Sequence, residues 1–304
     1  MTNNRTLALA LLPLRHRSSL AACWRAWTSW TLDVVGAYCP RCVPFSLPAS
    51  NEPNKSSLHS LPPSLPGRVA LFGFIIDYSF IQSLARLGAN TLAIDASAEN
   101  IGIATRHAEQ DPGLAALSFR HAPAETLVQE TKRFDIVCSM EVIEHVDNPA
   151  AFLRSCAELV KVRPFTGPPA GTSSSSMSSS NLCCFQPGGH LFLSTVARTP
   201  LAYFLTILAA EKVLRLVEPG THTFSKYVNP EELVGFFAKP LTPDTRPWIS
   251  RTYAHGLPTR VEGELRGLIY IPWQGDWVLA PRSTTPWSTQ ASYLFWVRRP
   301  KDDA

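Results

Sequence analysis

The sequence predicts an α/β fold built on a mostly parallel, doubly wound sheet. Between residues 69 and 195, short apolar runs alternate with longer segments of helical periodicity, which is the rhythm of β-α-β units. Acidic residues follow two of these runs, where ligand-binding groups lie at the carboxyl ends of parallel strands. The chain has 304 residues, 45% of them apolar, and is therefore large enough to bury a core.

The elements can be placed in order from their composition and their end signals. Short apolar runs predict strands at Val69–Leu71, Asn90–Ile94, Leu117–His121, Ile136–Cys138 and Leu191–Thr195. Longer periodic segments predict helices at 79–88, 97–109 and Pro149–Lys161. Gly88 is a helix stop signal, and Pro149 is a residue typical of a first helical turn. Parallel strands joined in this way require right-handed crossovers.

The segment after the fourth expected strand carries the most specific chemistry. Glu141, Glu144 and His145 are spaced i, i+3 and i+4, so a helix starting after Met140 would place all three side chains on one side. Three nitrogen and oxygen ligands on one face can hold a divalent metal. Alternatively, the acids are the solvated start of a helix, where they favour the helix dipole.

Asp95 closes the second expected strand and has two interpretations. A carboxylate at this position can accept hydrogen bonds from both hydroxyls of a ribose, as in adenosine-binding folds. It is equally compatible with helix capping, in which Asp95 or Ser97 caps the helix that follows.

The N-terminal region differs from the remainder. Residues 1–32 contain four arginines and no acidic residue, the pattern of a mitochondrial presequence, and these arginines account for the whole formal net charge of +4. Nothing in the remainder suggests nucleic-acid binding. We expect a presequence and extension at 1–42, a Pro/Ser-rich linker at 43–68 and one domain at 69–304. Cys138 and Cys156 lie in apolar segments as buried free thiols, which favours a reducing compartment.

Several segments together resemble a known family. They are residues 83–89, Ala93–Ser97, Phe134–Val146, Lys161 with Pro187–Gly189, Gly220–Lys226 and Gly267–Trp273. In this order they are similar to the mitochondrial ubiquinone biosynthesis O-methyltransferases, over about Pro66 to Val297. The resemblance implies a class I methyltransferase fold, a Rossmann-like, seven-stranded sheet with helices on both faces. It also implies methylation of polyprenylated catechols with S-adenosylmethionine (SAM).

The resemblance assigns roles to six residues. Asp95 matches the acid that binds the ribose of SAM, Met140 lines this cofactor, and Glu125 lies in the loop near the adenine. Glu141, Glu144 and His145 match the catalytic ligands of a divalent metal, usually Mg²⁺. Such an ion lowers the pKa of a catechol hydroxyl and orients it.

The family also implies a location and partners. The chain is expected at the matrix side of the mitochondrial inner membrane as a peripheral protein, with other ubiquinone-biosynthesis proteins. The apolar run Leu201–Ala210 is too short to span a bilayer and reads either as a core helix or as a membrane-dipping or tail-binding element. His222 and Lys226 lie just beyond it and are expected to close the site.

One departure from the family keeps an alternative function open, and another is an insert. The family has a glycine-rich loop after its first strand, whereas this chain has Phe72–Gln82, with Gly73 as its only glycine. A non-catalytic methyltransferase-like subunit is therefore the alternative function, and a methyltransferase with a soluble substrate is disfavoured by Gly220–Thr223. Residues 162–186 form a Ser-rich insert, interpreted as a retained in-frame intron or a surface loop.

Overall fold

The structure is a computed structural model that describes residues 68–73, 78–86, 88–162, 188–215, 220–253, 256–271 and 276–300. The expected presequence and extension, nearly all of the linker, and the insert beyond Val162 lie outside the described residues. Residues 74–77, within the segment that departs from the glycine-rich loop, lie outside them as well.

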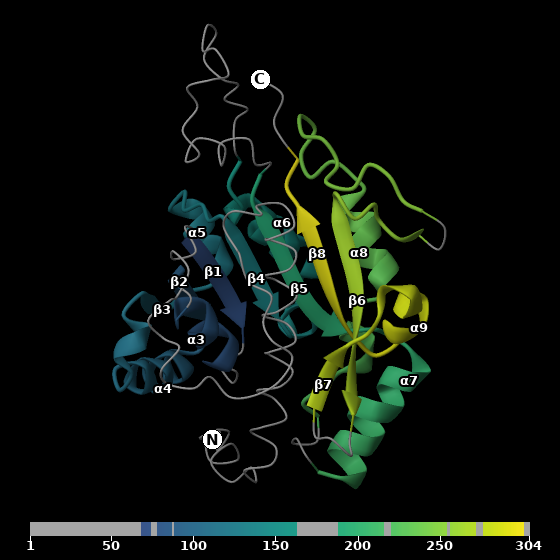
Figure 1. The fold of residues 1–304 in the computed structure, drawn as a ribbon, viewed down its shortest axis with the longest axis horizontal. Coiled ribbons are helices and arrows are strands. Elements are labelled where there is room, and N and C mark those ends of the chain that lie inside the picture. The colour runs from purple at the N-terminus through teal and green to yellow at the C-terminus, as the bar shows by residue number, and fades with distance from the viewer. Residues whose placement is uncertain are drawn as a thin grey trace, which may run out of the picture.

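One sheet organises the described chain, with the strand order β3-β2-β1-β4-β5-β8-β6-β7 (Figure 1). The strands are β1 Arg68–Gly73, β2 Asn90–Asp95, β3 Leu117–His121, β4 Ile136–Met140, β5 His190–Val196, β6 Gly263–Ile271, β7 Asp276–Leu279 and β8 Ser292–Arg298. Strands β1 to β5 pair in parallel, and β8 is antiparallel to both β5 and β6. In this spatial order, the seven strands β3-β2-β1-β4-β5-β8-β6 form the seven-stranded sheet of the expected fold class. Strand β7 adds an eighth strand at the edge, next to β6.

The helices are α3 Tyr78–Arg86, α4 Ala98–Ala108, α5 Ala124–Gln129, α6 Pro149–Leu159, α7 Pro200–Tyr203, α8 Pro230–Phe237 and α9 Thr285–Ser288. Single 3₁₀ turns are η2 Pro112–Leu114, η3 Ile143–His145, η6 Phe224–Lys226 and η8 Arg282–Thr284, and a π-helix, η5 Phe204–Val213, continues α7. The three expected helices are confirmed as α3, α4 and α6. Helix α6 ends two residues earlier than expected because Val160 forms a β-bridge with Phe134.

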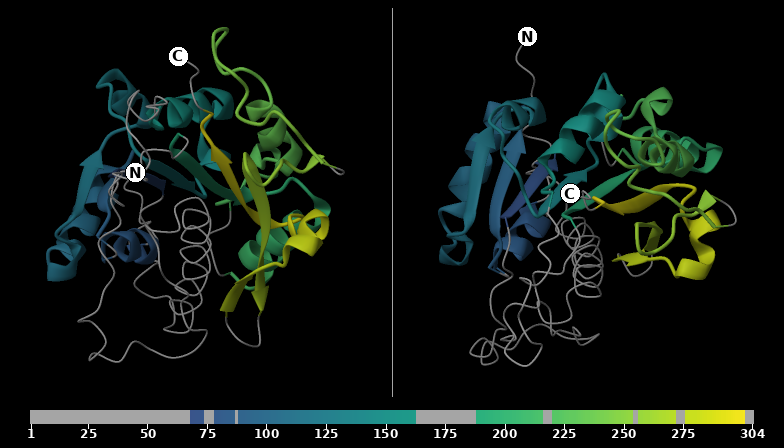
Figure 2. Two further views of the ribbon diagram at one scale, coloured as in Figure 1. Left: turned by 45° about the horizontal axis from the view of Figure 1, so that its top comes forward. Right: turned by 90° about the horizontal axis from the view of Figure 1, so that it is seen from above.

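Side chains alternate between the two faces of the sheet and so separate two apolar clusters. Leu191 and Leu193 of β5 belong to the cluster packed by α5, α6 and α8, whereas Phe192 belongs to the cluster that contains α3 residues. Figure 2 shows α6 and α8 side by side over one face. Helices therefore cover both faces, as the fold class requires.

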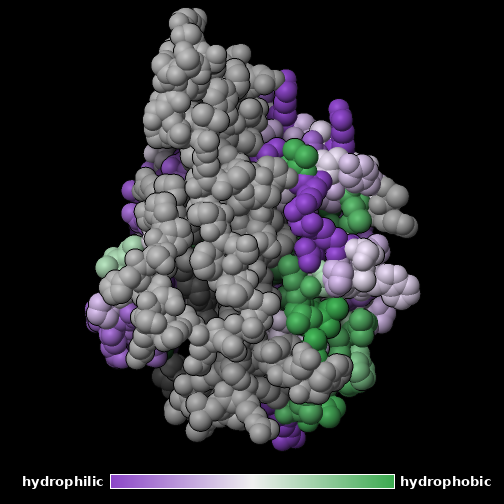
Figure 3. Space-filling model, viewed as in Figure 1, coloured by the Kyte–Doolittle hydropathy of each residue, from purple (hydrophilic) through white to green (hydrophobic). Residues whose placement is uncertain are grey.

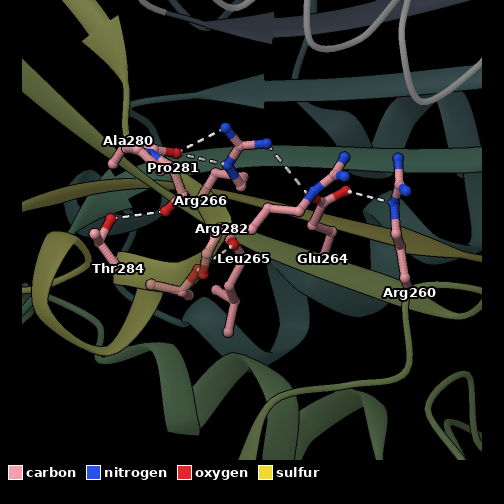
Figure 4. Close-up of polar contacts among 9 residues, drawn as sticks. Arg260, Glu264, Leu265, Arg266, Ala280, Pro281, Arg282 and Thr284 are labelled. Atoms are coloured by element: carbon pink, nitrogen blue, oxygen red, sulfur yellow. Dashed lines mark hydrogen bonds and ion pairs between the residues drawn. The ribbon is translucent and has the colours of Figure 1, made fainter.

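A cluster of charged side chains links β6 to the segments before it and after β7 (Figure 4). The buried carboxylate of Glu264 on β6 accepts a 2.6 Å hydrogen bond from Arg282 Nε, and Arg260 Nε lies 3.7 Å from its other oxygen. Arg266 donates two hydrogen bonds to the carbonyl of Ala280, at 2.9 and 2.7 Å. These contacts fix the segment after β7 against β6.

Within the described part of the chain, no helix combines the length and the apolar character that a membrane span requires.

Candidate active site

The parallel register brings the ends of four strands to one edge of the sheet. Gly73 of β1 is paired with Met140 of β4, and Met140 with Ser194 of β5. Asp95 is the last residue of β2, on the other side of β1. Two of the predicted cofactor residues, Asp95 and Met140, therefore flank the end of β1 on either side.

Asp95 is held by the start of α4. Its Oδ1 accepts a 2.6 Å hydrogen bond from Ser97 N–H and its Oδ2 a 3.2 Å bond from Asn100 Nδ2. The capping residue itself is Ser97, whose hydroxyl accepts from Asn100 N–H. Of the two capping alternatives, the structure thus selects Ser97, and Asp95 supports the same helix start with a fixed carboxylate.

Glu125 lies in the first turn of α5, and its side chain is exposed. The loop before it approaches the β2 end, since Ala122 N–H donates to Asp95 O at 3.2 Å. The structure therefore brings Ala122, three residues before Glu125, next to Asp95.

The helix expected after Met140 does not form. Glu141 takes a left-handed backbone conformation with φ 50°, and a single 3₁₀ turn, η3, carries Glu144 and His145. The left-handed conformation of Glu141 interrupts the helical path, and Glu141 N–H donates to both the carbonyl and the hydroxyl of Ser194, each at 3.1 Å, which ties this residue to β5. Helix α6 begins only at Pro149, with Asn148 as its N-cap.

Glu144 points into the protein rather than into solvent. Its carboxylate is buried and accepts a 2.9 Å hydrogen bond from Thr195 Oγ1. Burial, followed by the neighbouring charge of Glu141, raises the pKa of Glu144 well above its ordinary value. The solvated-helix alternative is therefore wrong for Glu144, because its carboxylate is buried and lies close to that of Glu141.

The donor types fit a divalent cation, but the arrangement is incomplete. Two carboxylates that repel each other, with an imidazole one residue after Glu144 and four after Glu141, offer the oxygen and nitrogen ligands that such a cation takes. Among the residues that the structure describes, however, no group of three or more His, Cys, Asp or Glu is placed to hold a metal ion. Because Glu144 is turned toward Thr195, the metal-ligand role of Glu141, Glu144 and His145 stays a prediction.

The segment expected to close the site lies against this strand end. Lys226 Nζ is 3.1 Å from Asp147 Oδ1. Burial lowers the pKa of the His145 imidazole, and His222 in its protonated form and the ammonium group of Lys226 lower it further. His222 and Lys226 are therefore neighbours of the predicted ligand His145.

Two functional candidates escaped the sequence analysis. Glu211, buried on η5, accepts 2.8 Å hydrogen bonds from Gly220 N–H, His222 N–H and His222 Nδ1. Tyr227, also buried, shares a 2.6 Å hydrogen bond with Thr206 Oγ1, and burial raises its pKa to about 12. In the sequence, the signal for Glu211 is an acidic residue directly after the apolar run Leu201–Ala210. This pattern is equally typical of a solvated helix end, so it did not identify Glu211 as functional.

Apolar side chains gather on one outer surface, along α7 and η5. We define the apolar surface as the exposed side chains of Leu201, Tyr203, Phe204, Leu205 and Leu208. Figure 3 shows it at the lower right, where Figure 1 places α7 beside the β6–β7 hairpin. The prediction of a plain core helix for Leu201–Ala210 is therefore wrong over much of its length.

The sheet order and the strand-end site define a class I methyltransferase domain, and residues 78–163 match the family model described as a methyltransferase domain. The chain is 34% identical over 220 residues to the mitochondrial ubiquinone biosynthesis O-methyltransferase of Schizosaccharomyces pombe, covering 72% of this chain and 64% of that protein. It is equally 34% identical to the ubiquinone biosynthesis O-methyltransferase of Ralstonia nicotianae, covering 72% of this chain and 71% of that protein. The chain belongs to the ubiquinone biosynthesis O-methyltransferase family.

Coverage of the relatives is partial. The corresponding protein of Acinetobacter baylyi is 37% identical over 153 residues, which are 50% of this chain and 53% of that protein. The chain thus spans less than two thirds of the S. pombe protein and about half of the A. baylyi protein.

Proposed function

We propose that the chain transfers the methyl group of SAM to a hydroxyl of a polyprenylated catechol in ubiquinone biosynthesis. The observation that carries this proposal is that Asp95 and Met140 share one sheet edge with Glu141, Glu144 and His145, in a member of this family. Methyl transfer requires a donor site and a hydroxyl-activating site side by side.

Each half of the edge has its own residues. Asp95 would accept the ribose hydroxyls of SAM, Met140 would line this cofactor, and the backbone near Glu125 would contact its adenine. Glu141, Glu144 and His145 would hold a divalent cation such as Mg²⁺, with Glu144 turning away from Thr195 to do so. When bound, that cation lowers the pKa of the catechol hydroxyl.

Calorimetric titration with SAM tests the donor half. Wild-type protein should bind SAM, and Asp95→Asn should bind it about 10- to 100-fold more weakly, since a charged hydrogen-bond acceptor is lost. Asp244→Asn, at an exposed loop position, is the matched control and should bind as wild type does. Absence of heat at millimolar SAM would overturn the enzymatic proposal and favour the non-catalytic subunit, because Phe72–Gln82 replaces the glycine-rich loop.

Metal titration tests the other half. We expect Mn²⁺, followed by electron paramagnetic resonance, to bind wild-type protein and to bind Glu144→Gln at least tenfold more weakly, by roughly 1.4 kcal/mol or more. EDTA should lower the rate at which a short-chain polyprenyl catechol gains one methyl group in mass spectrometry. Equal Mn²⁺ binding by both proteins would remove Glu144 from the ligand set.

We propose that the protein works at the matrix face of the mitochondrial inner membrane, beside other ubiquinone-biosynthesis proteins. The arginine-rich segment 1–32 supports import, and the apolar surface supports contact with lipid or with the polyprenyl tail. In vesicle flotation, Phe204→Ser with Leu205→Ser should weaken binding. Val261→Ser, an equally exposed apolar residue in the loop before β6, should not. Equal flotation of both variants would contradict the assignment of this surface.

A further inference from the structure

A buried carboxylate on η5 holds the imidazole of His222 in one orientation. Glu211 Oε1 accepts hydrogen bonds from both the backbone N–H and the Nδ1 of His222, each at 2.8 Å. The side chain of Glu211 is 3% exposed, whereas that of His222 is 21% exposed. The acid is therefore shielded from water, and the ring that it holds is still accessible.

The charge of Glu211 decides which nitrogen of His222 carries the proton. Burial raises the pKa of the Glu211 carboxyl, but hydrogen bonds from Gly220 and His222 outweigh burial and bring this pKa below its ordinary value. Since an ionised carboxylate only accepts, the proton of the neutral ring lies on Nδ1. Nε2 then carries the lone pair and can accept a proton.

The segment that carries His222 is fixed beside the strand ends. Lys226 Nζ lies 3.1 Å from Asp147, two residues after His145. The rings of His222 and Tyr227 are 6.3 Å apart, and Tyr227 is anchored through Thr206 Oγ1 at 2.6 Å. The accessible ring of His222 thus lies next to the edge that carries Glu141, Glu144 and His145.

On the basis of the proposed function, we infer that His222 is the base that takes the proton from the catechol hydroxyl to be methylated, with Glu211 as its positioning residue. The O–H bond breaks and an Nε2–H bond forms. The resulting phenolate oxygen bonds to the methyl carbon of the sulfonium, whose carbon–sulfur bond breaks with the electron pair left on sulfur. The imidazolium then releases its proton to water.

This division gives the two groups of polar residues different tasks. Glu141, Glu144 and His145 orient the catechol oxygens, and His222 receives the proton. Among the described residues, the titratable side chains that interact with the ring include Glu211, Tyr227 and His145. The negative charge of Glu211 stabilises the imidazolium that forms, which is the task of a carboxylate behind a catalytic histidine.

The alternative is that the Glu211–His222 pair merely anchors the loop, and the choice of variants separates the two. His222→Asn keeps an amide donor near the position of Nδ1 for Glu211 and removes Nε2. His222→Ala opens a space that imidazole from the buffer can fill. Glu211→Gln keeps an acceptor and removes the charge. His107→Gln on α4 is the control histidine.

The assay is methylation of a short-chain polyprenyl catechol by wild-type protein and these variants, with SAM affinity measured by calorimetry. We expect His222→Asn to lower kcat by about 10²- to 10⁴-fold with unchanged KM and unchanged SAM affinity. Added imidazole should raise the kcat of His222→Ala and leave His107→Gln unaffected. Glu211→Gln should lower kcat, also with unchanged KM.

Two results would overturn the inference while wild-type protein is active: a wild-type kcat in His222→Asn, or no response of His222→Ala to imidazole. If wild-type protein binds no SAM and methylates nothing, the proposed function itself fails and the inference fails with it. The two failures are therefore distinguished by the wild-type measurement.

Discussion

At the scale of single residues, burial decides the chemistry of two thiols. Cys138 on β4 and Cys156 on α6 are both free and fully buried. Burial raises the pKa of each thiol above its ordinary value, so little reactive thiolate forms. We expect N-ethylmaleimide to leave the peptides that contain these cysteines unlabelled in folded protein and to label them in urea, as read by mass spectrometry. Equal labelling in both states would contradict the packing of β4 and α6.

A single hydroxyl supports the buried carboxyl of Glu144. Thr195→Val keeps the shape of the side chain but removes the hydroxyl that donates to the buried carboxylate of Glu144. We expect the free energy of unfolding to fall by about 1–3 kcal/mol in urea titration.

Thr91→Val is the matched control for this substitution. Thr91 is an equally buried strand threonine, and its hydroxyl donates to the carbonyl of Ala89. The loss should be about 1 kcal/mol or less, because that carbonyl is a neutral backbone acceptor. A larger loss at Thr91 than at Thr195 would argue against the contact between Thr195 and Glu144.

At the scale of elements, two glycines differ in whether a larger side chain would fit at their position. A Cβ at Gly267 on β6 would lie 2.3 Å from both Cβ and the carbonyl oxygen of Ser288, so Gly267→Ala must displace α9. A Cβ at Gly235 in α8 would meet nothing within 4 Å. In thermal unfolding, Gly267→Ala should lower Tm. Gly235→Ala should raise the stability by about 0.5–1 kcal/mol, since alanine is the better helix former. Similar effects of both would contradict the close packing of α9 on β6.

The element that sequence reasoning misjudged is the segment after β4. The spacing of Glu141, Glu144 and His145 suits an α-helix, but Glu141 takes a left-handed backbone conformation and donates its N–H to Ser194 of β5. Such a contact joins residues far apart in the chain, and local periodicity carries no information about it. The same limit applies to Glu211, whose partners lie beyond the residues not described at 216–219.

At the scale of the whole molecule, residues on either side of the insert are hydrogen-bonded to each other. Gly189 N–H donates a 3.0 Å hydrogen bond to the carbonyl of Lys161, so the described chain comes together on the two sides of the insert. If Lys161 were joined directly to Pro187, the residues Lys161, Pro187, Gly188 and Gly189 would form a β-turn. Proline in the second position and glycine in the third is a favoured turn sequence. We therefore predict that the domain does not need residues 162–186.

Deletion of residues 162–186 tests this prediction. The deleted protein should unfold at an equal or higher Tm, because the shorter loop loses less entropy on closing, on the order of 2 kcal/mol. A protein of full length with residues 163–186 in scrambled order is the control and should match wild type. An unfolded deletion variant would show that the insert is part of the domain.

The sequence alone determined the five parallel strands, three of the helices, their alternation and hence the fold class, because apolar periodicity and end signals such as Gly88 and Pro149 are local properties. It also determined which polar residues follow the strands, including Asp95, Glu141, Glu144 and His145. The tertiary structure alone decided how these side chains point: Glu144 inward to Thr195, Asp95 onto α4, and Glu211 onto His222. The physical reason is that a buried polar group must find its hydrogen-bond partner wherever the fold provides one, and that partner is seldom a neighbour in the chain.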